Sequence, residues 1–448
     1  MILLLFIAIS TWILVPILGI FPLLLWLQLR HLKRAKTIHK NNNLVENIFI
    51  LCIIITISIF ASSTTVYSDT AVYIDSYEKM NWNDIFNQSQ SNSDIYGYGL
   101  EMVLFILCYP IKILSNSSPY YFLLFFSLFV NIATVYIAKS VSKKYYFLLL
   151  IIIFSTVVYY NHVFLMRQFL SNVFLLIAAI NIDFLTFWLL LPLSLFSHLS
   201  TLPYLILLIL IKIIVFYNLL HKKANSNADV VLPRIKQIYP NIKKNSLFAI
   251  NKSSRAKLLI VLLMVILSAL FSTSSNSSNS ILSSLLPDIQ AAQTISQRSE
   301  HYLGSDSDTT SLGNIFFVTA TFLTIGILLR KLSFETTSPT TFFLIVVLAI
   351  QIAISCFMPN IIRMRLALLL LSYQGLFYSV LADSKNKLLE RLTWIYPLFS
   401  IASMIRYFII MPSYPEYSGI LVFFKGEVLS KNLIDYLDFF VNARVIID

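Results

Sequence analysis

Apolar runs long enough to cross a membrane recur along this 448-residue chain, separated by short polar or charged segments. Clear examples cover residues 2–28, 47–66 and 120–138. About 20 apolar residues in a helix cross the hydrocarbon core of a bilayer. With 58% hydrophobic residues, 12% charged residues and a mean hydropathy of +0.78, the chain cannot form a soluble globule. The sequence therefore predicts an all-α, polytopic integral membrane protein of about 11–13 helices, short or re-entrant ones included, in a single transmembrane domain.

The Lys and Arg residues lie mainly in connecting segments and predict which of these face the cytoplasm. Residues 30–40 carry five Lys or Arg and no acid, and residues 221–257 carry nine against one acid. The second of these segments predicts a cytoplasmic basic loop over about residues 219–257. Two sizeable polar stretches, about 67–99 and 272–314, are then predicted to be external loops. The net charge of +12 thus reflects topology and contact with anionic lipid, and no basic domain for nucleic acid is present in the sequence.

The segment 100–114 decides the topology of the chain that follows. It is shorter than a full span and begins with a glutamate. If it crossed the bilayer, the loop 139–144, sequence KSVSKK, would be external, against the preference of positive loops for the cytoplasm. We therefore expect 100–114 to form a re-entrant or half-depth helix.

The stretch 159–204 places two titratable residues, Arg167 and His198, within otherwise apolar sequence. The apolar pieces between them, 169–182 and 184–197, are each too short for a full span and suggest broken or tilted helices. Irregular backbone at membrane depth is tolerated only where it packs in protein or lines a wet cavity. The pattern predicts that this region forms the wall of a polar cavity.

Under this topology, titratable side chains gather at the external face. They are Asp69, Glu101, Arg167, His198, Arg363 and Arg365. An arginine presents a planar fork that matches phosphate oxygens and stays charged at physiological pH. A carboxylate or a histidine can accept the proton of an attacking sugar hydroxyl. The inventory therefore suits phosphate binding with acid or base chemistry.

Each of these residues also has a structural interpretation. Arg363 and Arg365 could anchor helix ends by snorkelling, and His198 could hydrogen-bond the backbone of a helix kinked by nearby prolines. Glu101 opens an apolar helix, where an acid stabilises the N-terminal end of the dipole. Arg167 lies between two apolar segments with no acid within one helical turn, which favours a functional role.

The sequence carries no metal-binding motif. The candidate cluster has no closely spaced acidic or histidine pair. The three cysteines lie in apolar runs without metal-ligand spacing and are interpreted as small core residues. They are Cys52, Cys108 and Cys356.

Four motifs resemble those of the EpsG-like branch of the Wzy oligosaccharide repeat-unit polymerases in their order along the chain and in their predicted external location. They are SDTAVYIDSY at 68–77, GYGLE at 97–101, MRQF at 166–169 and SHLSTLPY at 197–204. The resemblance implies a metal-independent glycosyltransferase that uses lipid-pyrophosphate-linked glycan donors. The implied catalytic residues are Glu101, Arg167 and His198. The implied pyrophosphate- or glycan-binding residues are Asp69, Tyr73, Gln168, Arg363 and Arg365.

Family members join repeat units carried on undecaprenyl pyrophosphate, so the resemblance implies synthesis of O-antigen or capsular polysaccharide at the periplasmic face of a bacterial inner membrane. The expected partners are these lipid-linked oligosaccharides, the bilayer and a chain-length regulator protein, with no cofactor and no nucleic acid. Two alternatives stay open: a lipid-linked oligosaccharide flippase or other transporter, and an O-antigen ligase. A transporter should carry cavity charges at several depths, whereas these charges concentrate at one face, which favours the polymerase.

The predicted topology can be tested by labelling single introduced cysteines in intact cells with a membrane-impermeant reagent. Cysteines at Ser91 and Ser305 should react and one at Ser226 should not, because the loop charges place only the first two outside. Labelling at Ser226 would contradict the orientation. External labelling at Ser142 would mean that residues 100–114 cross the bilayer fully.

Overall fold

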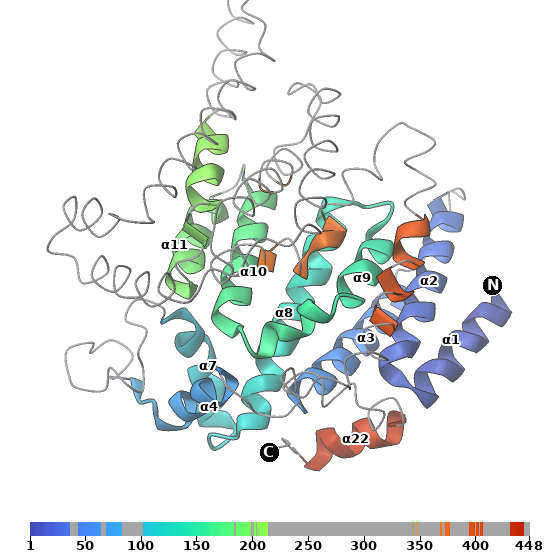
Figure 1. The fold of residues 1–448 in the computed structure, drawn as a ribbon, viewed down its shortest axis with the longest axis horizontal. Helices are drawn as coiled ribbons and strands as arrows, with labels where there is room; N and C mark the ends of the chain where they lie inside the picture. Colours follow the sequence, from blue (N-terminus) through green and yellow to red (C-terminus); the bar gives the residue numbers. More distant parts are fainter. Residues whose placement is uncertain are drawn as a thin grey trace, which may run out of the picture. The chain divides into compact units, whose positions relative to one another are not determined.

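The structure of the protein is a computed structural model, and within the residues that it describes all regular secondary structure is helical (Figure 1). The all-α prediction is therefore confirmed for this part of the chain. The described residues are 1–35, 44–63, 69–82, 102–182, 185–198, 201–202, 204–213, 431–442 and short pieces within 344–405.

The chain divides into two compact units. The first comprises residues 1–180, 188–201 and 368–448, and the second comprises 181–187 and 202–367. In the described part of the second unit, the Lys212 ammonium lies 4.7 Å from the centre of the Phe187 ring and donates to the Ile182 carbonyl. The contacts described below lie within the first unit.

Two helices of the described residues are long and apolar enough to cross a membrane, α3 (Leu44–Ser62) and α8 (Pro119–Val141). Their mean hydropathies are 2.5 and 2.0, and they coincide with two of the predicted spans. The two helices pack together, and the Asn131 amide of α8 donates to the Ser58 hydroxyl of α3 over 2.9 Å. These candidate spans support a membrane protein.

The first apolar run, residues 2–28, does not form the single span that the sequence predicts. It breaks into α1 (Ile2–Leu14) and α2 (Pro16–Ala35), because a proline suits the first turn of a helix and disfavours helical backbone in the residue before it. A Cβ atom on Gly19 would lie 2.1 Å from the Trp12 Cα, whereas seven residues of continuous helix span about 10 Å. The run is therefore a hairpin in which α1 packs back against α2.

The predicted external loop 67–99 contains a helix, α4 (Asp69–Lys79), which buries Thr70, Tyr73 and Tyr77 along one side. Helical periodicity of these side chains explains why an otherwise polar segment is ordered here. The α4 helix packs against α7 (Val103–Leu114), whose Lys112 donates to the carbonyls of Glu78 and Met80 over 2.8 and 2.5 Å.

The length of α7 bears on the topology. Its 12 residues extend about 18 Å, which is less than the roughly 30 Å hydrocarbon core of a bilayer. Two residues with left-handed backbone, Asn116 and Ser117, then turn the chain directly into α8. These features support the interpretation of 100–114 as a half-depth element.

Continuous hydropathy also predicts an outward span over residues 145–160, and this segment is broken as well. It consists of α9 (Tyr146–Phe154), whose nine residues are all buried, and the 3₁₀ helix η1 (Val157–Val163). A helix that is apolar on every side packs in an interior, and α9 lies between α2 and α8 (Figure 1). The hydroxyls of Ser155 and Thr156 bond back to the Ile152 carbonyl over 2.9 and 3.0 Å, which favours a change of helix type at this point.

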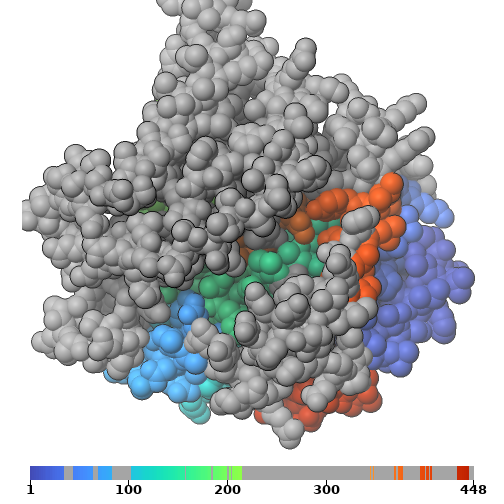
Figure 2. All heavy atoms as spheres, viewed as in Figure 1, coloured from blue at the N-terminus to red at the C-terminus, as the bar shows by residue number. Residues whose placement is uncertain are grey.

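Short pieces of the C-terminal third pack onto the end of α9, and they are drawn in orange in Figure 2. The Gln374 amide donates to the Thr156 hydroxyl over 2.7 Å and accepts from Tyr396 over 3.1 Å. A Cβ atom on Gly375 would lie 2.7 Å from the Leu149 carbonyl oxygen, so this position allows a close approach that a larger residue would prevent.

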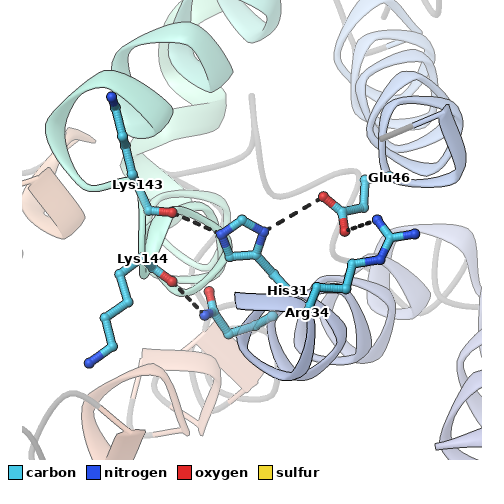
Figure 3. A network of polar contacts seen from close by, with 6 residues as sticks. His31, Arg34, Glu46, Lys143 and Lys144 are labelled. Carbon is cyan, nitrogen blue, oxygen red and sulfur yellow. Dashed lines mark hydrogen bonds and ion pairs between the residues drawn. The ribbon is translucent and has the colours of Figure 1, made fainter. Parts of the chain in front are cut away.

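Two segments that are predicted separately to be cytoplasmic meet in the structure (Figure 3). Gln28, at the end of the first apolar run, donates to the Lys144 carbonyl over 2.8 Å. Three residues later, the His31 ring lies 3.0 Å from the Lys143 carbonyl oxygen. The basic end of α2 and the basic turn between α8 and α9 therefore lie on the same side of the molecule, as the charge pattern predicts.

An ion-pair cluster lies at the same end of the molecule, where α2 meets the turn between α8 and α9. The Glu46 carboxylate, in the first turn of α3, lies 2.9 Å from the Arg34 guanidinium and 3.7 Å from the His31 ring (Figure 3). The carboxylate raises the pKa of His31 above its ordinary value of 6.5, and partial burial opposes this effect. The cluster thus connects α2, α3 and the turn before α9.

The stability of the purified protein should fall as pH rises through the folded-state pKa of His31. Because folding raises the pKa of His31, protonated His31 contributes fully to the free energy of unfolding below about pH 6.5. This contribution is lost as the pH rises above the pKa of His31 in the folded state. Because the pair is partly exposed, the loss should be at most about 1 kcal/mol. Melting temperatures in detergent from about pH 6 to about pH 9 should decline for the native chain and change less for His31→Gln. Parallel curves for the two proteins would contradict this origin.

Candidate functional site

The site is built around Arg167, the second residue of α10 (Met166–Ile180), and Tyr73 of α4. Arg167 Nε donates to the Tyr73 hydroxyl over 3.3 Å, and the guanidinium carbon lies 5.3 Å from the centre of the tyrosine ring. Only 5% of Arg167 and 3% of Tyr73 are exposed. A hydrogen bond and a cation–π contact therefore orient a buried cation, and two residues predicted from separate motifs come together.

The α4 helix is held against the start of α10 by a second contact. The hydroxyl of the buried Thr70 donates to the Val163 carbonyl over 2.9 Å, three residues before α10 begins. Asp69 precedes Tyr73 by one helical turn and is half-buried, so its carboxylate lies on the face of α4 that carries Tyr73. Gln168 follows Arg167 and is buried.

His198 lies directly after α11 (Thr186–Ser197) and is half-buried. Its carbonyl accepts from the Thr201 hydroxyl over 2.9 Å, and the Ser171 hydroxyl oxygen lies 3.4 Å from the same carbonyl oxygen. Ser171 and Ser194 form two reciprocal hydrogen bonds. The Ser171 hydroxyl donates to the Ser194 carbonyl over 2.5 Å, and the Ser194 hydroxyl donates to the Ser171 carbonyl over 3.0 Å. This hydroxyl cluster (Ser171, Ser194 and Thr201) binds the end of α11 to α10.

The hydroxyl cluster relates His198 to Arg167. Ser171 follows Arg167 by four residues, and residues at this spacing lie on the same face of a helix. Ser171, which contacts the end of α11, and Arg167 therefore lie along one side of α10, about one turn apart. The structure brings Arg167 into contact with Tyr73, whereas Asp69 and Gln168 are placed only as neighbours of these two residues in their helices, and the His198 backbone through Ser171.

A buried polar network positions the segment that leads into α10. The Asn131 amide of α8 donates to Ser127 over 3.2 Å, in addition to its bond with Ser58, and its oxygen accepts from the Tyr159 hydroxyl over 2.9 Å. Tyr159 belongs to η1, so a single amide side chain joins α3, α8 and η1.

His162 completes this network as a neutral residue. Its Nδ1 lies 2.8 Å from the Tyr159 carbonyl, which can only accept, so Nδ1 carries the proton. Its Nε2 lies 2.8 Å from the Ser127 hydroxyl and can accept from it. With both ring nitrogens engaged and no exposed surface, His162 holds η1 in place and is not a candidate base.

Three predicted site residues lie outside the described residues, and their roles stay predictions. They are Glu101, Arg363 and Arg365. Within the described part of the chain, no group of three or more His, Cys, Asp or Glu side chains could hold a metal ion.

The sequence prediction missed the hydroxyl cluster and the contacts of Thr70 and Asn131. A signal was present in each case, because these are polar residues within apolar or amphipathic helices. Such residues often hydrogen-bond between helices where water is absent. Their partners in other helices and segments could not be predicted, since Ser194, Ser58 and Val163 lie between 23 and 93 residues away from Ser171, Asn131 and Thr70 along the chain.

Comparison of the chain with protein-family models, with curated proteins and with solved structures finds no match. The chemistry of the site must therefore be argued from its own residues. A buried, oriented guanidinium can hold the oxygens of a phosphate, and an adjacent histidine can exchange a proton with a bound hydroxyl.

Removal of the Ser171 hydroxyl should loosen the end of α11. Ser171→Ala removes this donor from the Ser194 carbonyl, which keeps its bond from the His198 nitrogen, and should lower the free energy of unfolding by about 0.5–1.5 kcal/mol. Ser197→Ala is the matched control, because the buried Ser197 hydroxyl bonds only within its own helix, to the Leu193 carbonyl. Thermal unfolding in detergent should show the larger decrease for Ser171→Ala, and an equal decrease for both variants would contradict a specific contact between the helices.

Proposed function

We propose that the protein is a polytopic membrane glycosyltransferase that polymerises undecaprenyl-pyrophosphate-linked repeat units, as the resemblance to the EpsG-like Wzy polymerases implies. The observation that carries the proposal is the convergence of Arg167 on Tyr73, with the His198 turn held one helical turn away by the Ser171 contact. These residues belong to three separate motifs of the resemblance. Their approach supports a common site.

Arg167 is assigned to the pyrophosphate of the lipid carrier. In the reaction, a hydroxyl oxygen of the incoming unit forms a bond with the anomeric carbon of the growing chain, and the bond from that carbon to the pyrophosphate oxygen breaks. Negative charge develops on the leaving pyrophosphate, and a guanidinium already oriented in a site of low dielectric constant stabilises it. Arg363 and Arg365 are proposed to share this task.

Tyr73 is assigned to the positioning of Arg167. The hydroxyl and ring of Tyr73 both contact the guanidinium, and Tyr73 is itself buried. This differs from the direct binding of substrate that the resemblance implies for Tyr73. Asp69, one turn away on the same helix, and Gln168 are left as candidates for contact with the glycan.

His198 or Glu101 is assigned to the proton of the attacking hydroxyl. Either side chain can act as general base when it lies within hydrogen-bond reach of that hydroxyl. The His198 backbone is placed by the bond from the Thr201 hydroxyl and by its contact with Ser171, which limits where the imidazole can reach. The proton accepted from the hydroxyl then passes to solvent.

We assign the site to the periplasmic face of the inner membrane. The basic segments that contain Arg34 and Lys143 meet at one end of the first unit, and positive segments prefer the cytoplasm. The Arg167 site is formed by segments predicted to be external, namely α4 and the start of α10. The structural grouping supports the predicted sidedness.

The test is the polysaccharide ladder of cells in which a deleted chromosomal copy is complemented by variants. Arg167→Ala removes the phosphate contact, so the proposal expects a loss of roughly 2 to 4 kcal/mol of transition-state stabilisation, about 30-fold to 1000-fold in rate. Arg167→Lys keeps the charge and loses the planar fork, so it should be impaired as well. Long chains should disappear while single repeat units remain on the final acceptor. The matched control is Arg34→Lys, which retains a cation beside Glu46 far from the site and should keep the full ladder.

Two outcomes would overturn the proposal. A full-length ladder from Arg167→Ala at normal protein level would remove the catalytic assignment. Loss of the single-unit band in the deletion strain would indicate transport, because a flippase defect prevents any unit from reaching the external face.

A further inference from the structure

The helix α22 (Leu433–Asn442) near the C-terminus is capped by its own residues. The Asn432 side-chain oxygen accepts from the backbone nitrogens of Ile434 and Asp435 over 2.8 and 3.2 Å, and the Asp435 carboxylate accepts from the Asn432 nitrogen over 2.7 Å. This reciprocal arrangement is a capping box, which stabilises the first turn of a helix. The ten-residue helix is thus well defined at its start.

One side of α22 faces the protein. Tyr436 is almost fully buried, and its ring lies 6.2 Å from that of Phe439, which is half-buried. The helix contacts α3 and α1 and lies beside the lower end of α1 in Figure 1. Its surface is partly visible in red at the bottom of Figure 2.

A second side of α22 is apolar and exposed. Ile434 is 75% exposed, Leu437 54% and Val441 74%, at the spacing i, i+3 and i+7 that forms one stripe of a helix. The partly exposed Phe440 widens this stripe. Four large apolar side chains in contact with water would be unfavourable, so this stripe needs an apolar environment.

The third side of α22 is polar. Asp438 and Asn442 are exposed and bond to each other, and Asp435 lies on the same side. At 100° per residue these three positions occupy a narrow sector between the protein-facing side and the apolar stripe. The helix therefore meets three environments: protein, an apolar phase and water.

The neighbours of α22 indicate what the apolar phase is. Candidate span α3 exposes its own apolar stripe of Leu44, Ile48, Leu51 and Ile55. The α1 helix, which also contacts α22, exposes Ile13 and Leu14 at its C-terminal end, beside α22. In a membrane protein such stripes are covered by lipid, so the apolar side of α22 extends a lipid-facing surface. Its polar side requires water, which places the helix at the edge of that surface.

We propose that α22 is an interfacial helix that lies in the headgroup region of the bilayer, with Ile434, Leu437 and Val441 inserted about 5–10 Å into the boundary with the acyl chains. Binding depends on apolar insertion and not on anionic lipid, because the polar side of the helix carries carboxylates. A second copy of the chain docked on α22 alone would not form a stable interface, since four side chains offer far less than the roughly 800 Å² per partner that such an interface buries. The proposal requires a membrane protein but does not depend on the reaction assigned above.

The test uses the full-length protein in lipid nanodiscs, with its three cysteines replaced by alanine. Nitroxide labels are placed singly at Leu437→Cys and Val441→Cys on the apolar side and at Asp438→Cys and Asn442→Cys on the polar side. Collisions with oxygen, which concentrates in lipid, are compared with collisions with a water-soluble nickel chelate. The ratio should be several-fold higher at the first pair, in both zwitterionic and anionic lipid.

Equal ratios of oxygen to nickel-chelate collisions at all four positions would overturn the proposal. Exclusion of both reagents from a label at position 437 would also overturn it and would indicate a protein partner. A second measurement keeps the native cysteines in case their replacement prevents folding. In otherwise native chains, Leu437→Trp should add fluorescence that brominated lipids quench, and Asp438→Trp should add fluorescence that they quench several-fold less. Similar quenching of the two added signals would also contradict the proposal.

Discussion

The arrangement of the site depends on one buried amide, Asn131 in the middle of α8. Its nitrogen donates to Ser58 and Ser127, and its oxygen accepts from Tyr159. In an apolar interior each of these polar groups would be costly without a partner, so the network permits few alternative arrangements. It fixes η1 against α3 and α8, and Arg167 follows the end of η1 by four residues.

Charge is separated toward two ends of the first unit. At one end, the Arg34, His31 and Glu46 cluster connects helices through ion pairs and backbone carbonyls. At the other, the Arg167 guanidinium is buried against the ring of Tyr73. The first arrangement stabilises the fold, and the second is the one that we propose binds a phosphate.

Sequence reasoning succeeded where one local property decided the outcome. The short helices α10 and α11 follow the two short apolar pieces, and α3 and α8 follow the long ones. It was wrong for residues 2–28 and 145–160, where hydropathy is continuous but the backbone is not. Pro16 breaks the helix in the first case, and the consecutive hydroxyl residues Ser155 and Thr156 break it in the second. Hydropathy measures neither effect.

The candidate site shows the same division. Arg167 and His198 could be identified from their residue type and setting, because a titratable group in apolar sequence is costly unless it has a use. Tyr73 lies in a polar segment and was indicated only by the family resemblance. The sequence by itself determined the helical class, the apolar spans and the unequal charge of the connecting segments, since all of these follow from local composition. Only the tertiary structure decided that Tyr73 orients Arg167 and that Ser171 brings in the end of α11, because both contacts join residues far apart in the chain and depend on how the helices pack.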